Sequence, residues 1–339
     1  MPATEQGDTA GGGRTGGGRT GGGRTGGVLA AGGAGSAEVV DALLPLVLAD
    51  HDLRSSGAVA VSAGRIRQEQ LRLLVASKTF LVGSAILLFW IVCAVFGGLF
   101  RPYNPLAQNL LATNQAPSAT HLFGTDNLGR DVLSRVITGS RQILVVAPAA
   151  ALVGTIFGTV LGLLQGYYRG ALDTITGRIV DAFLALPIVI VAFLFIVAAG
   201  PSVATLIVVI GFAFGLVISR TVRTAVLQER ELDYIAAARL RGEGAAHTMF
   251  VEVLPNVAGP IIVEFTVRLG YAVFTVATLS FLGFGIQPPT PDWGADIAAT
   301  YSYLSAGYWW ETLFPALAIA SLITAINLIG DSVESVIIQ

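Results

Sequence analysis

Apolar residues occur along this chain in six long blocks, which short polar intervals separate. A helix needs about 20 apolar residues to cross the roughly 30 Å hydrocarbon core of a bilayer, and each block approaches that length. We therefore predict an all-α, polytopic membrane protein with six transmembrane helices. The predicted spans are approximately Phe80–Phe100, Ile143–Tyr167, Ile179–Ala199, Val203–Ser219, Ile261–Gly283 and Leu313–Gly330.

Two local patterns predict how these spans pack. The interval Gly200–Ser202 between the third and fourth spans is so short that it predicts a tight helical hairpin. Gly154, Gly158 and Gly162 recur every four residues in the second span, a spacing that lets helix backbones approach closely in membranes. We expect this glycine face to pack against a neighbouring helix.

Composition agrees with a membrane protein and narrows its partners. Charged residues make up only 12% of the 339 residues, against about 25% in soluble domains. The net charge of −2 argues against nucleic acid as a partner. Cys93, the single cysteine, lies in an apolar block, so no disulfide framework is predicted and the side chain is expected to be a small buried hydrophobe.

Basic residues predict the orientation in a cell membrane. Positive charge concentrates in cytoplasmic loops. Eleven basic residues share one side: Arg65, Arg67, Arg72, Lys78, Arg169, Arg178, Arg220, Arg223, Arg230, Arg239 and Arg241. Four occupy the other side: Arg101, Arg130, Arg135 and Arg141. Both termini are therefore expected in the cytoplasm.

The N-terminal part differs in composition. Residues 1–64 are interpreted as a flexible, Gly-rich cytoplasmic tail that contains a threefold GGGRT repeat. This repeat is no phosphate loop, because arginine replaces the required lysine and no strand precedes it, and no signal peptide is predicted. Ala37–Leu53, interrupted by Pro45, is expected to be a membrane-surface helix or an extension from an upstream start. Residues 65–78 predict an interfacial helix, and residues 79–339 the transmembrane domain.

The polar interval Glu229–Pro260 predicts a docking element on the cytoplasmic side. Ala236, Ala237 and Ala238 give a small-faced helix, predicted over about residues 232–244, which Gly242 ends or bends. Leu254 and Pro255 then lead into the fifth span. A short, flat helix of this kind fits a groove on a partner.

Charged residues elsewhere suggest ion pairs. Asp126, Arg130 and Asp131 predict a cluster that braces the far-side loop, with contact to a binding protein as the alternative. Glu264 and Arg268 lie four residues apart in the fifth span and face one another, either as a structural pair or as pathway lining.

No metal site is predicted. Each of the two histidines that we weighed as ligands lacks cysteine, histidine or carboxylate neighbours at ligand spacing. They are His121 and His247.

The cytoplasmic interval resembles the EAA motif of ABC importer permeases. The alanines, Gly242 and Leu254-Pro255 keep the spacing of that motif, but Ala236 stands where the motif has glutamate, so docking is expected with one polar contact fewer. The resemblance implies a coupling loop at about residues 221–256. Its contact residues are Asp233, Tyr234, Ala236, Ala237, Ala238, Arg239, Arg241, Gly242, Leu254 and Pro255.

A second motif is similar to that of the C-type permeases of dipeptide, oligopeptide and nickel importers. It comprises His121, Gly124, Thr125, Asp126, Gly129, Arg130, Asp131, Ser134, Arg135 and Gly139. Blocks at Ser280–Gly294, Phe314–Pro315 and Asn327–Asp331 match the same family, so the resemblance covers about residues 65–333.

This resemblance implies a type I importer permease that takes up di- or oligopeptides. The implied partners are a second, B-type permease, two ATP-binding subunits or one fused ATPase, an extracytoplasmic solute-binding protein and the bilayer. ATP and magnesium would bind the partners, and this chain would hold no cofactor and catalyse no reaction. A nickel-chelate, glutathione or haem importer is the alternative within the family, and a proton-coupled carrier the alternative of another class.

Overall fold

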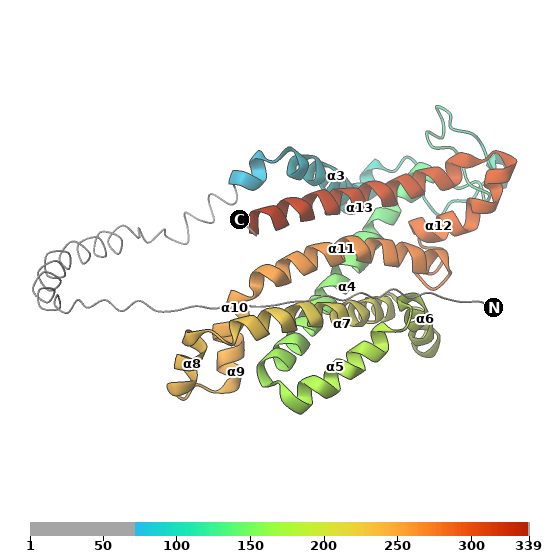
Figure 1. The fold of residues 1–339 in the computed structure, drawn as a ribbon. Coiled ribbons are helices and arrows are strands. Elements are labelled where there is room, and N and C mark those ends of the chain that lie inside the picture. The colour runs from blue at the N-terminus through green and yellow to red at the C-terminus, as the bar shows by residue number, and fades with distance from the viewer. Residues whose placement is uncertain (1–71, 338–339) are drawn as a thin grey trace, which may run out of the picture. The chain divides into compact units, whose positions relative to one another are not determined.

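A computed structural model describes residues 72–337, which are helical apart from short connections (Figure 1). Within this range no strand forms, and the only β-type pairing is an isolated bridge between Thr125 and Asp131. The predicted tail, the predicted helix Ala37–Leu53 and the first part of the predicted helix at 65–78 lie outside the described residues. Residues 72–76 are helical, and Ser77 caps the helix that follows.

Five helices of the described range are long and apolar enough to cross a membrane. At a rise of about 1.5 Å per residue, the shortest of them, with 23 residues, reaches about 35 Å. They are α3 (Lys78–Phe100), α4 (Val132–Tyr168), α7 (Val203–Glu229), α11 (Ala258–Phe281) and α13 (Trp309–Ile337).

The third predicted span is not one continuous helix. It consists of α5 (Gly170–Leu184) and α6 (Ile188–Ala199), which are bent by 92° at the intervening residues. Pro187 explains the break, because proline donates no backbone hydrogen bond and disfavours helical geometry in the residue before it. The prediction of a continuous helix at 179–199 is corrected, and six spans result when the bent pair counts as one.

Shorter elements connect the long helices. On the chain between α7 and α11 lie α8 (Asp233–Leu240), α9 (Ala245–His247), a π-helical turn (Thr248–Val253) and α10 (Leu254–Asn256). Three others flank α4 and α13 in sequence: the 3-10 turns Leu110–Ala112 and Tyr301–Ala306, and α12 (Trp293–Thr300).

The predicted hairpin between the third and fourth spans is confirmed. Gly200 ends α6 with a φ of +84°, a value that glycine adopts without strain. The Ser202 side chain then accepts a hydrogen bond from the Thr205 N–H at 3.0 Å and caps α7. Helices α6 and α7 contact each other along this hairpin.

The glycine face of α4 packs against α7, as predicted. A Cβ atom added at Gly158 would lie 2.6 Å from the Gly215 carbonyl oxygen, and one at Gly162 would lie 2.7 Å from that of Ser219. Gly154 is similarly close to Gly211 on α7. Such backbone proximity drives helix association in lipid, where burial of apolar surface contributes little.

Trp293 holds α12 against the beginning of α4. Its indole Nε1 donates a 2.8 Å hydrogen bond to the Val136 carbonyl oxygen, and its ring meets Trp90 of α3 edge-on at 4.8 Å between centroids. Gly139 leaves the space, since an added Cβ would lie 2.8 Å from the Trp293 ring. A buried indole N–H with a partner therefore fixes this end of the helix bundle.

We predict that Gly158→Ala destabilises the permease, whereas Gly98→Ala does not. Alanine in a helix gains about 1 kcal/mol over glycine, but overpacking against the Gly215 carbonyl costs about 1–3 kcal/mol and moves α4 from α7. An added Cβ at Gly98 meets no atom within 4 Å. Thermal unfolding in detergent should show a lower midpoint for Gly158→Ala alone; equal midpoints would contradict the close packing.

Candidate functional site

The α8–α10 segment, residues 233–256, begins with a short helix that is sharply terminated. The Gly242 N–H donates to the Arg239 carbonyl at 3.0 Å, and the Glu243 N–H donates to the Ala238 carbonyl at 3.2 Å. With a φ of +81° at Gly242, this is the Schellman arrangement that ends helices. The role predicted for Gly242 is confirmed, but the helix ends at Leu240 and is shorter than the predicted range 232–244.

Helix α8 has one buried and one exposed side. Ile235 and Ala238 are fully buried, while Ala236 and Ala237 are exposed. Leu240 is 90% exposed. Ala236, Ala237 and Leu240 thus face away from the chain, whereas Ala238, expected to be a contact residue, is buried and is corrected to a packing position. Two further apolar side chains of the segment, Phe250 and Val251, are also exposed.

Tyr234 connects α8 to the end of α7 and to α10. Its hydroxyl donates to Glu229 Oε1 of α7 at 2.6 Å and accepts from Asn256 Nδ2 of α10 at 2.9 Å. Burial, together with the bond to the Glu229 carboxylate, raises the pKa of Tyr234 to about 12. Leu254 is half-buried, and Pro255 lies exposed in the first turn of α10.

The arginines of the segment have partners within the chain. The Arg239 guanidinium lies over the Tyr167 ring, 5.2 Å from its centroid. Arg241 pairs with Glu243 at 2.6 Å and lies 3.7 Å from Glu252. Asp233 stands exposed in the first turn of α8.

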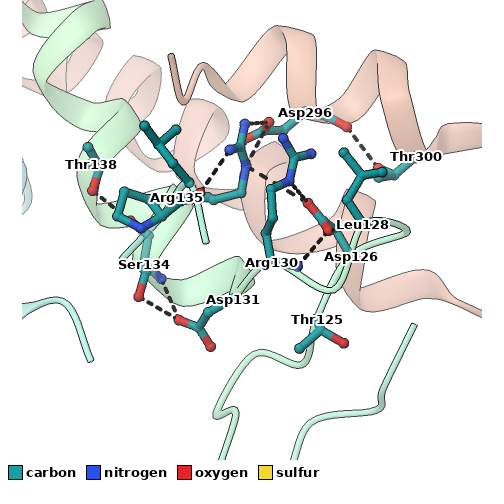
Figure 2. Close-up of polar contacts among 12 residues, drawn as sticks. Thr125, Asp126, Leu128, Arg130, Asp131, Ser134, Arg135, Thr138, Asp296 and Thr300 are labelled. Carbon is teal, nitrogen blue, oxygen red and sulfur yellow. Dashed lines mark hydrogen bonds and ion pairs between the residues drawn. The ribbon is translucent and has the colours of Figure 1, made fainter. Parts of the chain in front are cut away.

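A buried ion-pair network holds the far-side motif (Figure 2). Asp126 accepts from Arg130 Nε at 2.6 Å and from the Leu128 and Arg130 backbone N–H groups at 2.9 Å each. Arg135 donates through two nitrogens to Asp296 Oδ1 and through Nη1 to the Pro105 carbonyl at 3.1 Å. The predicted Asp126–Arg130 pair is confirmed, and α4 is tied to α12 through Arg135.

Asp131 does not belong to that network, contrary to the prediction. Its carboxylate caps α4 by accepting from the Ser134 N–H at 2.8 Å and the Ser134 hydroxyl at 2.7 Å. The other oxygen lies 2.9 Å from His121 Nδ1. The reason is local: an aspartate at the N-cap position satisfies the free N–H groups of the first turn.

Two glycines and a threonine of the motif allow close approach of the preceding loop. A Cβ at Gly129 would lie 1.9 Å from the Asn109 carbonyl oxygen, and one at Gly124 would lie 2.4 Å from that of Gln115. The Thr125 hydroxyl donates to the Ala112 carbonyl at 2.5 Å. The motif therefore braces residues 109–115.

Two carboxylates near this network were not singled out from the sequence. Asp296 has one oxygen without a hydrogen-bond partner, and neither oxygen of the buried Glu311 has one. Burial raises the pKa of Asp296, and the Arg135 guanidinium offsets part of that effect. The signal that the sequence offered was their rarity, since few charged residues occur in this part of the chain.

The predicted contact between Glu264 and Arg268 is confirmed. Arg268 Nε donates to Glu264 Oε2 at 3.0 Å, and the Thr221 hydroxyl of α7 donates to Glu264 Oε1 at 2.7 Å. The pair therefore joins α11 to α7.

The surroundings of the two histidines differ from expectation. Besides Asp131 beside His121, Glu243 Oε2 lies 3.8 Å from His247 Nε2, and Glu252 is close to both. The expectation for His247 is corrected, because Glu243 lies four residues before it and four-residue spacing brings side chains together on a helix. Asp131 and Glu252 come close to the histidines through turns of the chain. Arg241 already pairs with the two glutamates.

Comparisons with known proteins identify the family. Residues 158–339 match the "Binding-protein-dependent transport system inner membrane component" family, and residues 67–117 match the "N-terminal TM domain of oligopeptide transport permease C". The dipeptide transport system permease protein DppC of Bacillus subtilis is 35% identical over 85% of this chain and 90% of its own length.

Two further relatives are named for the transport of different solutes. The di/tripeptide transport system permease protein DppC of Pseudomonas aeruginosa is 36% identical over 76% of this chain and 87% of its own length. The glutathione transport system permease protein GsiD of Pectobacterium atrosepticum is 36% identical over 73% of this chain and 82% of its own.

The chain therefore belongs to the family of binding-protein-dependent transport system inner membrane components, in its oligopeptide permease C branch. It is a multi-pass transport permease of the type I ABC importer fold. This membership favours the importer over the proton-coupled carrier that the sequence left as an alternative.

We predict a pH dependence of stability from Asp292, the buried N-cap of α12. Burial raises the pKa of Asp292 from 3.8 to about 6. The folded protein then keeps a proton that the unfolded chain releases, so this residue makes stability fall as pH rises from about 4 to about 6. The difference is on the order of 3 kcal/mol.

Asp292→Asn retains the capping oxygen and removes the ionisation. Thermal midpoints measured between pH 4 and pH 6 should decline less in this variant than in the parent. Asp233→Asn, at an exposed position, serves as control and should follow the parent. Identical slopes for all three proteins would contradict the assignment.

Proposed function

We propose that this chain is the C-type permease subunit of an ATP-driven importer of di- and oligopeptides. The observation that carries the proposal is the similarity over most of the chain to permeases that are named for dipeptide and di/tripeptide transport. Glutathione is the second candidate solute, because a relative named for its transport is equally similar. Glutathione is itself a short peptide, so both solutes are small and zwitterionic.

The proposed assembly contains a second, B-type permease, ATP-binding subunits and an extracytoplasmic solute-binding protein. In this proposal the chain spans the cell membrane and both of its termini lie in the cytoplasm. The distribution of basic residues favours this orientation. The partners bind and hydrolyse ATP with magnesium. The two permeases alternate access to a pathway between them, driven by movement of the ATPases.

The α8–α10 segment is the proposed contact with an ATPase. The surface of Ala236, Ala237 and Leu240 supplies the apolar contact. Tyr234 bonds to both Glu229 of α7 and Asn256 of α10, so a push on α8 reaches two helix ends together. The far-side network of Asp126, Arg130, Arg135 and Asp296 is proposed as a structural brace beneath the binding protein.

Uptake by cells tests the solute. Cells lacking this gene should lose uptake of a labelled dipeptide, and restoring the gene should return it; glutathione, nickel and haem uptake are measured in parallel. Loss of glutathione uptake alone would show that glutathione, and not a dipeptide, is the solute. Intact dipeptide uptake with loss of nickel or haem would contradict the peptide proposal and keep the permease class.

Leu240→Glu tests the docking surface. A charge at this exposed position disturbs an apolar contact with the ATPase without altering the permease interior, so the ATPase subunits should no longer co-purify in detergent. Leu111→Glu is the matched control, since Leu111 is 96% exposed and lies in the segment before α4. Full ATPase retention by Leu240→Glu would contradict docking at this surface.

A further inference from the structure

Helix α5 separates polar from apolar side chains along its length. At 100° per residue, Asp173, Thr174, Arg178 and Asp181 occupy one side. The opposite side carries apolar residues that are exposed: Leu172, Ile175 and Ile179. A helix with this pattern in a membrane protein turns its apolar side to lipid or protein and its polar side to water.

A cavity of about 490 Å³ opens along the polar side of α5. Helix α7 forms the opposite wall with Arg220, Arg223 and Thr224, and Gln165 of α4 contributes to the lining. Figure 1 shows α5 beneath α7, and the C-terminal end of α7 continues into α8. The volume falls within the range of small-molecule sites, about 300–1,000 Å³.

The charges that line the cavity are of both signs. Arg223 donates two hydrogen bonds to Asp173, from Nε at 2.6 Å and from Nη2 at 2.7 Å. Arg220 pairs with Asp181, and both of these side chains are more than half exposed. Arg178 has no ion-pair or hydrogen-bond partner among residues 72–337. Five charged side chains in one cavity contrast with 12% charged residues overall.

The two ion pairs differ in how easily a ligand can replace them. The Arg223–Asp173 pair is bidentate and Asp173 is largely buried, so a ligand does not easily displace this pair. The Arg220–Asp181 pair is solvated, and such pairs contribute about 1 kcal/mol or less. A ligand that brings one positive and one negative group can therefore take over Arg220 and Asp181 at little cost.

We propose that the α5–α7 cavity binds a short zwitterionic peptide at the cytoplasmic end of the pathway. The peptide carboxylate contacts Arg178 and Arg220, and its ammonium group contacts Asp181. This site rests on the proposed function and on the orientation that places Arg169 and the α8–α10 segment in the cytoplasm. It gives the permease a solute contact of its own, distinct from the pocket of the binding protein.

Cysteine labelling tests the site in the assembled importer. In a Cys93→Ser background, Thr174→Cys places a thiol on the polar side of α5, and Ile175→Cys places its matched control one residue further, on the apolar side. The permease is reconstituted into liposomes with its partner permease, ATPases and binding protein. A sulfonated, membrane-impermeant thiol reagent is then added with or without dialanine.

The thiol at position 174 should react severalfold faster than the thiol at 175. Dialanine at about four times its dissociation constant should slow the reaction at 174 about fivefold. Arg178→Gln should raise the dialanine concentration needed for half-protection about tenfold, since one lost charge contact of about 1.4 kcal/mol has that effect. Arg101→Gln, at the other end of the bundle, should leave protection unchanged.

Gly177→Cys provides a second position on the cavity wall, because an added Cβ there meets no atom within 4 Å. If Thr174→Cys fails to assemble, Gly177→Cys takes its place, and dialanine should slow the reaction of its thiol about fivefold in the same way.

Four results would overturn the proposal. Equal reaction rates of the thiols at positions 174 and 175 would show that water does not reach the polar side of α5 preferentially, and would contradict the cavity. Unchanged reaction with dialanine, in vesicles that take up labelled dialanine, would exclude the peptide site and leave the importer function intact. Protection that follows the phosphatidylglycerol content instead of dialanine would assign the cavity to a lipid headgroup. Failure of the parent importer to take up dialanine would reject the proposed function, and this site with it.

Discussion

The close backbone contact between α4 and α7 is the constraint on which the rest of this structure depends. Gly154, Gly158 and Gly162 let the two helices approach until an added Cβ would lie under 3 Å from carbonyl oxygens of α7. Helix α4 begins at the far-side network, where Asp131 caps it and Arg135 reaches Asp296. Helix α7 ends at Glu229, which binds Tyr234 of α8. One packed pair thus connects the two sides of the permease.

This connection gives a physical basis for the proposed coupling. A helix resists bending, so in the proposed coupling a displacement of α8 would pass through Tyr234 to the end of α7 and, across the glycine contact, to α4. The break at Pro187 acts differently. It separates α5 from α6 by a 92° bend, and α5 contacts α7 through the Arg223–Asp173 and Arg220–Asp181 pairs and through Phe183 against Phe212. The α5 segment is therefore held by two ion pairs together with an aromatic contact.

The sequence predicted those features that depend on local spacing. Four-residue glycine spacing predicted that this face packs against a neighbouring helix, which the structure identifies as α7. Positions i and i+4 predicted the Glu264–Arg268 pair, and Gly242 predicted the end of α8. The break in the third span was missed because apolar composition continues through Pro187 and conceals the bend. The partners of Asp131 and Arg135 were also missed. Capping geometry selects His121 and Ser134 for the first, and tertiary packing brings Asp296, 161 residues away, to the second.

Crosslinking at Ala237 tests the central claim most directly, namely that α8 meets an ATPase subunit. In the Cys93→Ser background, a cysteine at position 237 would be paired with single cysteines along the ATPase surface in the assembled importer. The account predicts a disulfide crosslink at position 237 whose yield changes when ATP binds. Absence of any crosslink from position 237, in an importer that still takes up peptide, would contradict it.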